Sequence, residues 1–200
     1  MAEDSPTSGA ARSVRVGWVA DAAAMAGVQV RAWRHGYARA LPSRVTEAID
    51  PDTVTRAWSQ ALRRPPSARH RVLVALEHGE VVGFAALTPG QDPDAHPVRD
   101  AEMTVLAVDP ANHRAGHGSR LLAAVADTAR ADGFSRVTTW VLAQDDALRR
   151  FLLSAGWAPD GAHREMLLST STDGDPASAD ATDAEAAARQ VRLHTALETT

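Results

Sequence analysis

A strand–turn–helix–strand pattern between residues 101 and 142 constrains the fold more than any other feature of this chain. "AEMTVLAV" and "RVTTWVL" predict strands, and the apolar residues of "RLLAAVADTAR" between them repeat at helical spacing. Two strands that are joined through a helix pair in parallel, by a crossover connection. The chain is therefore expected to contain a parallel strand pair.

The segments around this unit predict antiparallel strands and further helices. "RVLVALEHGEVVGFAAL" predicts a hairpin that turns within residues 77–80. Helices are expected at 22–33, at 51–62 and around 148–155, a first strand at 14–19, and two last strands in "REMLLS" and "RQVRLHTAL". The predicted fold class is α/β (α+β), a single domain in which helices flank a central, mixed, mostly antiparallel sheet.

Composition divides the 200 residues into one domain and two polar segments. Residues 1–13 are small and polar and are expected to form a disordered N-terminal tail, followed by one domain at 14–200. Within that domain, residues 169–188 are rich in acidic side chains. They are expected to form a mobile loop before the last strand.

Charge and residue usage exclude several classes of function. The net charge of −4 argues against nucleic acid or an anionic membrane as a partner. The chain has no cysteine and no lysine, which excludes disulfides, thiolate chemistry, a Walker A site and Schiff-base catalysis. The histidines lack the spacing of metal ligands, so no metal is expected. With no apparent signal peptide or membrane span, a cytoplasmic protein is expected.

Gly116 and Gly118 stand in the turn between the strand and the helix, where glycine costs backbone entropy. The residues alone leave two explanations open. The glycines either provide positive φ in a tight loop, or they let an anion approach the free N–H groups at the start of the helix, with Arg114 and Arg120 at the rim. The dinucleotide-binding fingerprint fits poorly, because its third glycine would fall at Leu121.

The order of these segments resembles the GNAT superfamily of acyl-CoA-dependent N-acyltransferases. That family has a [Gln/Arg]-x-x-Gly-x-[Gly/Ala] loop after its fourth strand, whose backbone binds the pyrophosphate of coenzyme A. Here the pattern falls on His113, Gly116 and Gly118, with histidine where Gln or Arg is usual. "SAGW" is similar to the family's helix end, and "VRAWRHGYARALP" (30–42) to its first helix and turn. The resemblance extends over Val14 to Leu168.

The resemblance implies acetyl-CoA as a co-substrate and names the residues that bind it. The loop residues implied are His113, Arg114, Ala115, Gly116, His117, Gly118 and Ser119. A backbone N–H group of the preceding strand, within Leu106, Ala107 and Val108, is implied to meet the acyl carbonyl. The side chain of His117 is expected to be exposed near the phosphates, where a cation would help.

The resemblance also points to residues that act on the acceptor amine. Glu102 is the expected general base, since it lies on the strand beside the acyl site. Alternatively it is a solvent-facing strand residue, or an ion-pair partner of Arg99 or Arg136. Trp33 and Tyr37 stand where the family covers its acceptor site, although aromatic residues on helices usually pack in cores.

The implied function is transfer of an acetyl group, or another acyl group, from acetyl-CoA to an amine of a small molecule or peptide. In many relatives a tyrosine four residues before the closing glycine protonates the leaving thiolate, and Leu152 occupies that position here. This departure keeps open a non-catalytic acyl-CoA-binding sensor or regulatory domain. A nucleotide-binding module is a third interpretation. Homodimer formation, which is common in the family, is left open.

Overall fold

The computed structural model describes residues 12–36, 49–168 and 186–198. Tyr37 and most of the expected tail and acidic loop lie outside these ranges. A seven-stranded sheet runs through the described residues in the order β1-β2-β3-β4-β5-β7-β6. Its strands are β1 (Arg12–Val16), β2 (Arg71–Glu77), β3 (Glu80–Pro89), β4 (Asp100–Val108), β5 (Arg136–Leu142), β6 (Ala158–Leu168) and β7 (Ala186–Ala196).

Strand pairing confirms the predicted mixed, mostly antiparallel sheet. Strands β4 and β5 pair in parallel, and all other neighbouring strands pair antiparallel. The segment between β4 and β5 contains α4 (His117–Ala131), so the predicted crossover is confirmed. Strand β7 follows β6 in the sequence but lies between β5 and β6 in the sheet.

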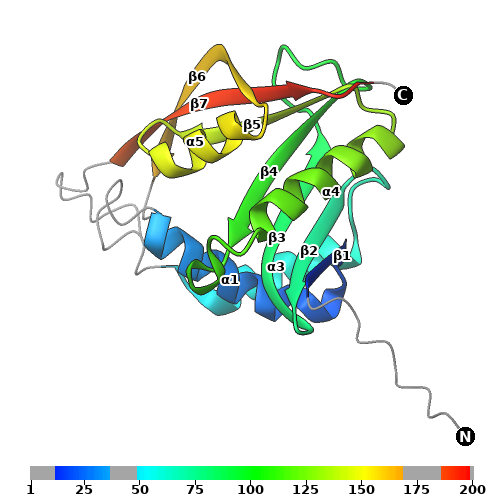
Figure 1. Cartoon of the computed structure of the whole chain (residues 1–200), viewed down its shortest axis with the longest axis vertical. Helices are drawn as coiled ribbons and strands as arrows, with labels where there is room; N and C mark the ends of the chain where they lie inside the picture. Colours follow the sequence, from blue (N-terminus) through cyan, green and yellow to red (C-terminus); the bar gives the residue numbers. More distant parts are fainter. Residues whose placement is uncertain (1–11, 37–48, 169–185, 199–200) are drawn as a thin grey trace, which may run out of the picture.

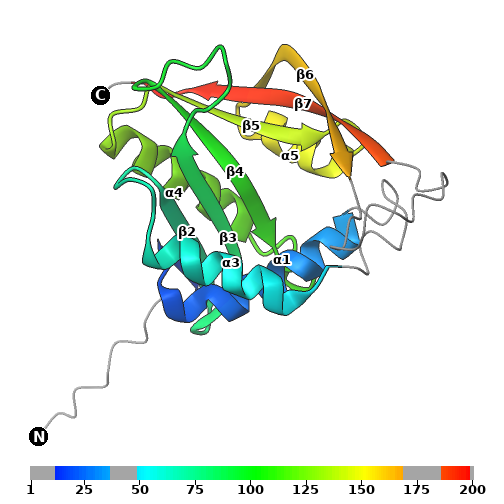
Figure 2. The same cartoon turned by 180° about the vertical axis from the view of Figure 1, so that it is seen from behind.

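Helices cover both faces of the sheet (Figures 1 and 2). On one face, α4 and α5 (Asp146–Ser154) pack with the strands around the larger apolar core. On the other face, α1 (Ala22–Gly36) and α3 (Pro51–Arg63) cover β2, β3 and β4, where Met25, Val28 and Phe84 are fully buried. Within the described residues, none from β5, β6 or β7 belongs to this second core.

Local sequence chemistry explains several element boundaries. His78 (φ 51°) and Gly79 (φ 89°) form the two-residue turn between β2 and β3, with both residues in the left-handed region that a type I′ turn requires. Helix α3 begins after Asp50, whose carboxylate accepts hydrogen bonds from the N–H groups of Asp52 and Thr53 at 3.1 and 3.0 Å. The predicted hairpin and second helix are confirmed.

Three predicted boundaries are wrong. The first strand ends at Val16 rather than residue 19, and it begins at Arg12, inside the predicted tail. The Asp21 carboxylate accepts a hydrogen bond from the Trp18 N–H at 2.7 Å, which favours a 3-10 turn at 19–21 over a longer strand. Strand β7 begins at Ala186, inside the predicted loop, because residues 186–188 already pair with β6.

Candidate active site

Strands β4 and β5 separate after a short parallel stretch, forming a fork in the sheet. Their last pair is Glu102 with Thr138. Beyond this pair, β5 continues with β7 and β4 continues with β3 as far as Val108. At the fork, the Thr139 hydroxyl donates a hydrogen bond to the Met103 carbonyl at 2.8 Å. Among the described strands, residues 103–108 of β4 therefore have no partner on the side of β5.

A β-bulge bends β4 just beyond the fork. Thr104 is an extra residue between the Leu87–Met103 and Ala86–Val105 pairs. A bulge increases the local twist of the strand that carries it. The bulge at Thr104 therefore contributes to the divergence of β4 from β5.

The three predicted acyl-site residues follow the bulge. The side chains of Leu106 and Val108 pack against the larger core, and Ala107 packs into the core beneath α1. Because these three side chains pack into the cores, residues 106–108 present only their backbone N–H and C=O groups to the fork. This placement is compatible with the predicted role of a backbone N–H group, which stays a prediction.

The turn from β4 to α4 is tied to the rest of the domain at its start. The Asp109 carboxylate accepts hydrogen bonds from the Ala111 N–H at 3.1 Å and from the Arg31 guanidinium of α1 at 2.6 and 2.8 Å. Further along, Arg114 (φ 64°) and Gly116 (φ 83°) both adopt the left-handed conformation. Gly116 therefore occupies a position that disfavours residues with a Cβ atom.

The backbone N–H groups of residues 114–119 form the most unusual feature of this turn. Within the described structure, none of the six donates a hydrogen bond to another protein group, and the Gly116 cap provides no side-chain oxygen. The first N–H groups of a helix have no acceptor within the helix, and the helix dipole adds partial positive charge there. We call this segment, residues 114–119, the N–H cradle. It has the donors and the polarity to bind a phosphate group.

The side chains of the cradle leave its rim open. His113, Arg114 and Ser119 are exposed, and the His113 ring lies 3.1 Å from the Val108 carbonyl oxygen. Arg120 donates to the Ala115 carbonyl at 3.2 Å, which holds its guanidinium beside the cradle. These two arginines provide positive charge next to the free N–H groups.

Gly118 has a packing role that its sequence alone does not show. A Cβ atom on Gly118 would lie 3.1 Å from the Phe151 ring of α5. The glycine therefore lets α5 approach the first turn of α4 closely. This contact places the cradle next to the larger core, against which Phe151 packs.

The predicted exposure of the His117 side chain is wrong. His117 is buried, with 1% of its surface accessible, because it lies one turn before Leu121 on the face of α4 that packs on the sheet. Its ring nitrogen Nε2 lies 3.4 Å from the Glu77 carboxylate. Any contact between His117 and a phosphate must therefore come from its backbone N–H group.

Glu77 connects three parts of the chain beneath the cradle. Its carboxylate accepts hydrogen bonds from Arg12 of β1 at 2.6 Å and from the Asn112 side chain at 2.8 Å. Arg12 also donates to the Ala115 carbonyl of the cradle at 3.3 Å. The Arg12 and Asn112 bonds lower the pKa of Glu77 from 4.5 to about 2.

Glu77→Gln is expected to lower the melting temperature at neutral pH, because the Arg12 guanidinium loses its charged partner. Since the pKa of Glu77 is lowered in the fold to about 2, its contribution to stability is present above the ordinary value of 4.5. That contribution is lost as the pH falls toward 2. Thermal denaturation of both proteins across this range tests the assignment, with Glu80→Gln as an exposed control on the neighbouring strand. A difference in melting temperature that does not shrink in acid would contradict it.

Glu102 lies at the fork, on the face of the sheet opposite α4 and α5. Its neighbours Ala101 and Met103 point into the larger core, and side chains alternate along a strand. Burial raises the pKa of Glu102, and the nearby Asp92 carboxylate adds to this effect. Arg136 pairs with Asp160 at 2.8 Å and with Asp100 at 3.7 Å, and in the described ranges neither Arg136 nor Arg99 forms the predicted ion pair with Glu102. The role of general base stays a prediction.

A buried arginine that the sequence did not single out organises the surroundings of Glu102. Arg192 of β7 binds three carboxylates, with Asp160 2.7 Å from its Nε atom and Asp92 and Asp94 3.0 and 2.7 Å from Nη1. Trp140 of β5 also donates to Asp92 at 3.0 Å. These bonds fasten the loop between β3 and β4 to β5, β6 and β7. Alternation of apolar and polar residues in "RQVRLHTAL" predicts the strand but not this charge cluster.

Of the two predicted acceptor-site aromatics, the structure describes only Trp33. Trp33 is half-buried on α1, and Tyr37 lies outside the described residues. A substrate role for either residue stays a prediction.

The described ranges contain no group of three or more His, Asp or Glu side chains arranged to hold a metal ion. In the same ranges, no helix has the length and apolar character needed to cross a membrane.

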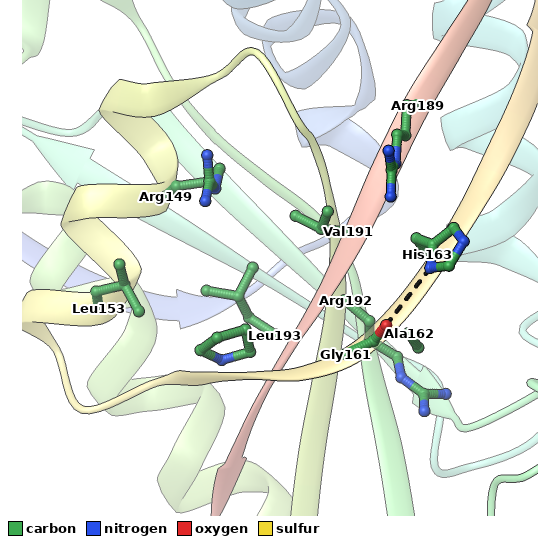
Figure 3. Close-up of a pocket in the computed structure, with 10 residues that line it drawn as sticks. Arg149, Leu153, Gly161, Ala162, His163, Arg189, Val191, Arg192 and Leu193 are labelled. Carbon is green, nitrogen blue, oxygen red and sulfur yellow. Dashed lines mark hydrogen bonds between the residues drawn. The ribbon is translucent and has the colours of Figure 1, made fainter.

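A cavity of about 140 Å³ lies on the other side of the sheet from Glu102, between α5 and strands β6 and β7 (Figure 3). Arg149 and Leu153 of α5 border it on one side, and Arg189 and His163 lie across from them. A second hollow, of about 310 Å³, begins at Ser119 and follows α4. Neither cavity includes Glu102 or the fork.

The sequence and the fold match an established family. The sequence fits the model of the Acetyltransferase (GNAT) family over residues 32–157, which is more than half of the chain. The chain belongs to this family, and the resemblance described from its motifs is confirmed.

Curated relatives include an uncharacterized N-acetyltransferase of Mycobacterium tuberculosis, which is 28% identical over 120 residues, or 60% of this chain and 71% of that protein. The mycothiol acetyltransferase of Rhodococcus erythropolis is 40% identical over 91 residues, a match that covers 46% of this chain and only 28% of the relative. The first relative has no named substrate. The second match is too short to carry its substrate over to this chain.

Solved structures share the fold. The PaiA N-acetyltransferase of Thermoplasma acidophilum, in complex with coenzyme A, has a TM-score of 0.68 at 15% identity, covering 92% of this chain and 98% of its own. YncA of Salmonella typhimurium, a putative acetyltransferase with acetyl-CoA, has a TM-score of 0.62 at 22% identity, covering 95% and 96%. At these identities the likeness is one of fold.

Proposed function

We propose that this protein is an N-acetyltransferase that transfers the acetyl group of acetyl-CoA to an amine of a small molecule or peptide. The observation that carries the proposal is the fork between β4 and β5, which places the unpaired edge of β4 between the N–H cradle and Glu102. Membership of the acetyltransferase family supports the same reaction class.

In this proposal the N–H cradle holds the pyrophosphate of acetyl-CoA, with Arg114 and Arg120 at its rim. A backbone N–H group of Leu106, Ala107 or Val108 faces the acyl carbonyl, where it stabilises the negative charge that develops on oxygen. The amine nitrogen attacks the carbonyl carbon, the new C–N bond forms, and the C–S bond breaks to release the thiolate of coenzyme A.

Glu102 takes the proton that the amine nitrogen loses, directly or through a water molecule. A carboxylate with a raised pKa is a stronger base than an ordinary glutamate, which favours this transfer. The thiolate takes up a proton to complete the reaction, and the products are the N-acetylated amine and coenzyme A.

One observation favours a second candidate function, binding of acyl-CoA without catalysis. Leu152, at the position where many relatives carry the tyrosine that protonates the thiolate, is fully buried in the larger core. Its neighbour Phe151 packs toward Gly118 and also lacks a hydroxyl group. A thiolate is a good leaving group, however, so the loss of this acid is compatible with a slower enzyme that uses water as the proton donor.

Release of free coenzyme A separates the two candidates. We expect thiol release when the protein is supplied with acetyl-CoA and a panel of amines, and calorimetry is expected to show binding of acetyl-CoA that ATP does not displace. Tight binding without thiol release from any amine would favour the non-catalytic candidate. Displacement by ATP would favour a nucleotide-binding module. A cytoplasmic location stays a prediction from the sequence.

A further inference from the structure

Strand register places a row of polar side chains on the same face of the sheet as Glu102. Paired residues on neighbouring strands, and residues two apart on one strand, point to the same face. Three pairs fix the row across four strands: Glu102 with Thr138, Trp140 with Arg192, and Gln190 with Arg164. This is the face whose other half α1 and α3 cover, and we call the row the polar face.

Arg164 is held in place at the β6 end of the polar face. Its guanidinium carbon lies 4.3 Å from the centre of the Trp140 ring, and its Nε atom donates to Gln190 at 2.7 Å. The Asp92 carboxylate lies 4.0 Å from Nη1. A guanidinium that stacks on an aromatic ring and bonds through Nε keeps its terminal N–H groups in a fixed plane.

The terminal N–H groups of Arg164 are available to a ligand. Its side chain is 46% exposed, and in the described structure neither Nη atom donates a hydrogen bond. Arg192, in contrast, is only 6% exposed and uses its donors on Asp92, Asp94 and Asp160. Arg192 and Trp140 both donate to Oδ2 of Asp92, and the other oxygen, Oδ1, lies 4.0 Å from Nη1 of Arg164, which is too far for a hydrogen bond.

We propose that the acceptor is an aminocarboxylate, whose carboxylate binds the Arg164 guanidinium while its amine lies at Glu102. The inference rests on the proposed function, since it assigns the substrate class of the same site. A planar guanidinium with two outward N–H donors matches the two oxygens of a carboxylate. Strand register places both groups on the polar face, and Trp140, which contacts Arg164, lies on the strand next to the one that carries Glu102.

The two ends of the polar face have opposite charges. Glu102 attracts the ammonium form of an amine, and Arg164 attracts a carboxylate, so a zwitterion is favoured over either an alkylamine or a dicarboxylate. An acceptor that carries only an amine would leave the terminal N–H groups of Arg164 without a hydrogen-bond partner on the ligand. The distance between Glu102 and Arg164 determines which length of aminocarboxylate can reach both groups. Ligands of increasing chain length can identify that length.

Matched acceptors test the substrate class. Coenzyme A release is measured with β-alanine, 4-aminobutyrate and 6-aminohexanoate against propylamine, butylamine and hexylamine, and with a tripeptide against its C-terminal amide. We expect at least one aminocarboxylate to have a kcat/KM about 10-fold or more above its partner without the carboxylate. Comparing the ω-amino acids with the tripeptide shows whether the acceptor is a small molecule or a peptide. Equal or better use of the uncharged partners throughout would overturn the proposal.

Arg164→Gln tests the residue. It is expected to raise KM for the preferred aminocarboxylate about 10- to 100-fold, to change kcat little, and to leave the kcat/KM of the matched alkylamine unchanged. Arg164→Lys keeps the positive charge but lacks the planar guanidinium. Its KM for the aminocarboxylate is expected to lie between those of the wild type and Arg164→Gln. Arg189→Gln, an exposed arginine on the face toward α5, is the matched control and is expected to behave as wild type. Equal effects of Arg164→Gln on both acceptor types would contradict the proposal.

Binding measurements keep this inference separate from the proposed catalysis. If no acceptor releases coenzyme A, the proposed catalysis is wrong, and calorimetry with 6-aminohexanoate and hexylamine in the presence of coenzyme A still decides the inference. Binding of the aminocarboxylate alone, lost in Arg164→Gln, supports it. Absence of such a preference in binding as well as in turnover rejects it.

Discussion

Glu102→Gln is expected to reduce kcat by roughly 10²-fold or more while leaving the affinity for acetyl-CoA nearly unchanged. The amide has the shape of the carboxylate but cannot accept the proton that the amine loses. Because Glu102 lies across the sheet from α4, its replacement does not alter the N–H cradle. Steady-state kinetics together with calorimetry measure both quantities, and Glu165→Gln, an exposed carboxylate on β6, is the control.

The pH dependence of the rate gives this test its sharpest form. In the wild type, kcat/KM is expected to rise as the pH increases through the raised pKa of Glu102, because only the ionised carboxylate acts as a base. That limb is expected to be absent from the Gln variant. If both proteins show the same pH–rate profile, the base lies elsewhere or the amine arrives already neutral.

Stability provides an independent check on the environment of Glu102. Because burial raises the pKa of this carboxyl in the fold, the folded state holds the proton more tightly than the unfolded state. The ionised side chain therefore destabilises the fold once the pH has risen through its raised pKa. Glu102→Gln is expected to melt at or above the wild-type temperature at neutral pH, and this difference disappears below the unfolded pKa. A large loss of stability at neutral pH would contradict this account.

Gly116→Val is expected to weaken acetyl-CoA binding by roughly 10²-fold. Gly116 has φ 83°, and a residue with a Cβ atom in this conformation costs about 1–2 kcal/mol, with further strain for a β-branched side chain. The backbone is expected to rotate out of the left-handed region, which turns neighbouring N–H groups of the cradle away from a common point. Calorimetric titration with acetyl-CoA measures the loss.

Gly133→Val is the matched control for this change. Gly133 follows the other end of α4 with φ 80°, and a Cβ atom there would meet nothing within 4 Å. Both variants therefore carry the same backbone strain, and both are expected to lose a similar amount of stability. Only Gly116→Val is expected to lose affinity. Unchanged affinity in a folded Gly116→Val protein would mean that the cradle does not bind the pyrophosphate.

The parts of the fold that local chemistry determines could be predicted from the sequence. The His78-Gly79 turn, the Asp50 cap and the apolar spacing of α4 each depend on residues within a few positions of one another. The same holds for the cradle, where the two glycines and the helix start lie within one short segment. The turn and the two helices were confirmed, whereas the role of the cradle in binding stays a prediction and the predicted exposure of His117 was wrong.

The rest depends on contacts between distant residues. Strand β7 inserts between β5 and β6. The carboxylates that bury Arg192 come from residues 100, 98 and 32 positions away in the sequence, at Asp92, Asp94 and Asp160. No local pattern distinguishes Arg192 from an exposed strand arginine, because its burial becomes favourable only when three carboxylates from other segments surround it. The same reason hides Arg164 and the polar face from the sequence.

The position of β7 also has a consequence for the order in which the sheet assembles. Strand β6 is synthesised before β7. It pairs only with β7, however, so it cannot join the sheet until β7 lies beside β5. We expect β6 and β7 to join each other first and then add to β5 as a preformed pair, at a late stage of folding. Because β7 carries Arg192, the loop between β3 and β4 gains its bonds to that guanidinium only in this last step. Chains released from the ribosome before that step would therefore expose the edge of β5, a hazard for aggregation that chaperones would need to cover.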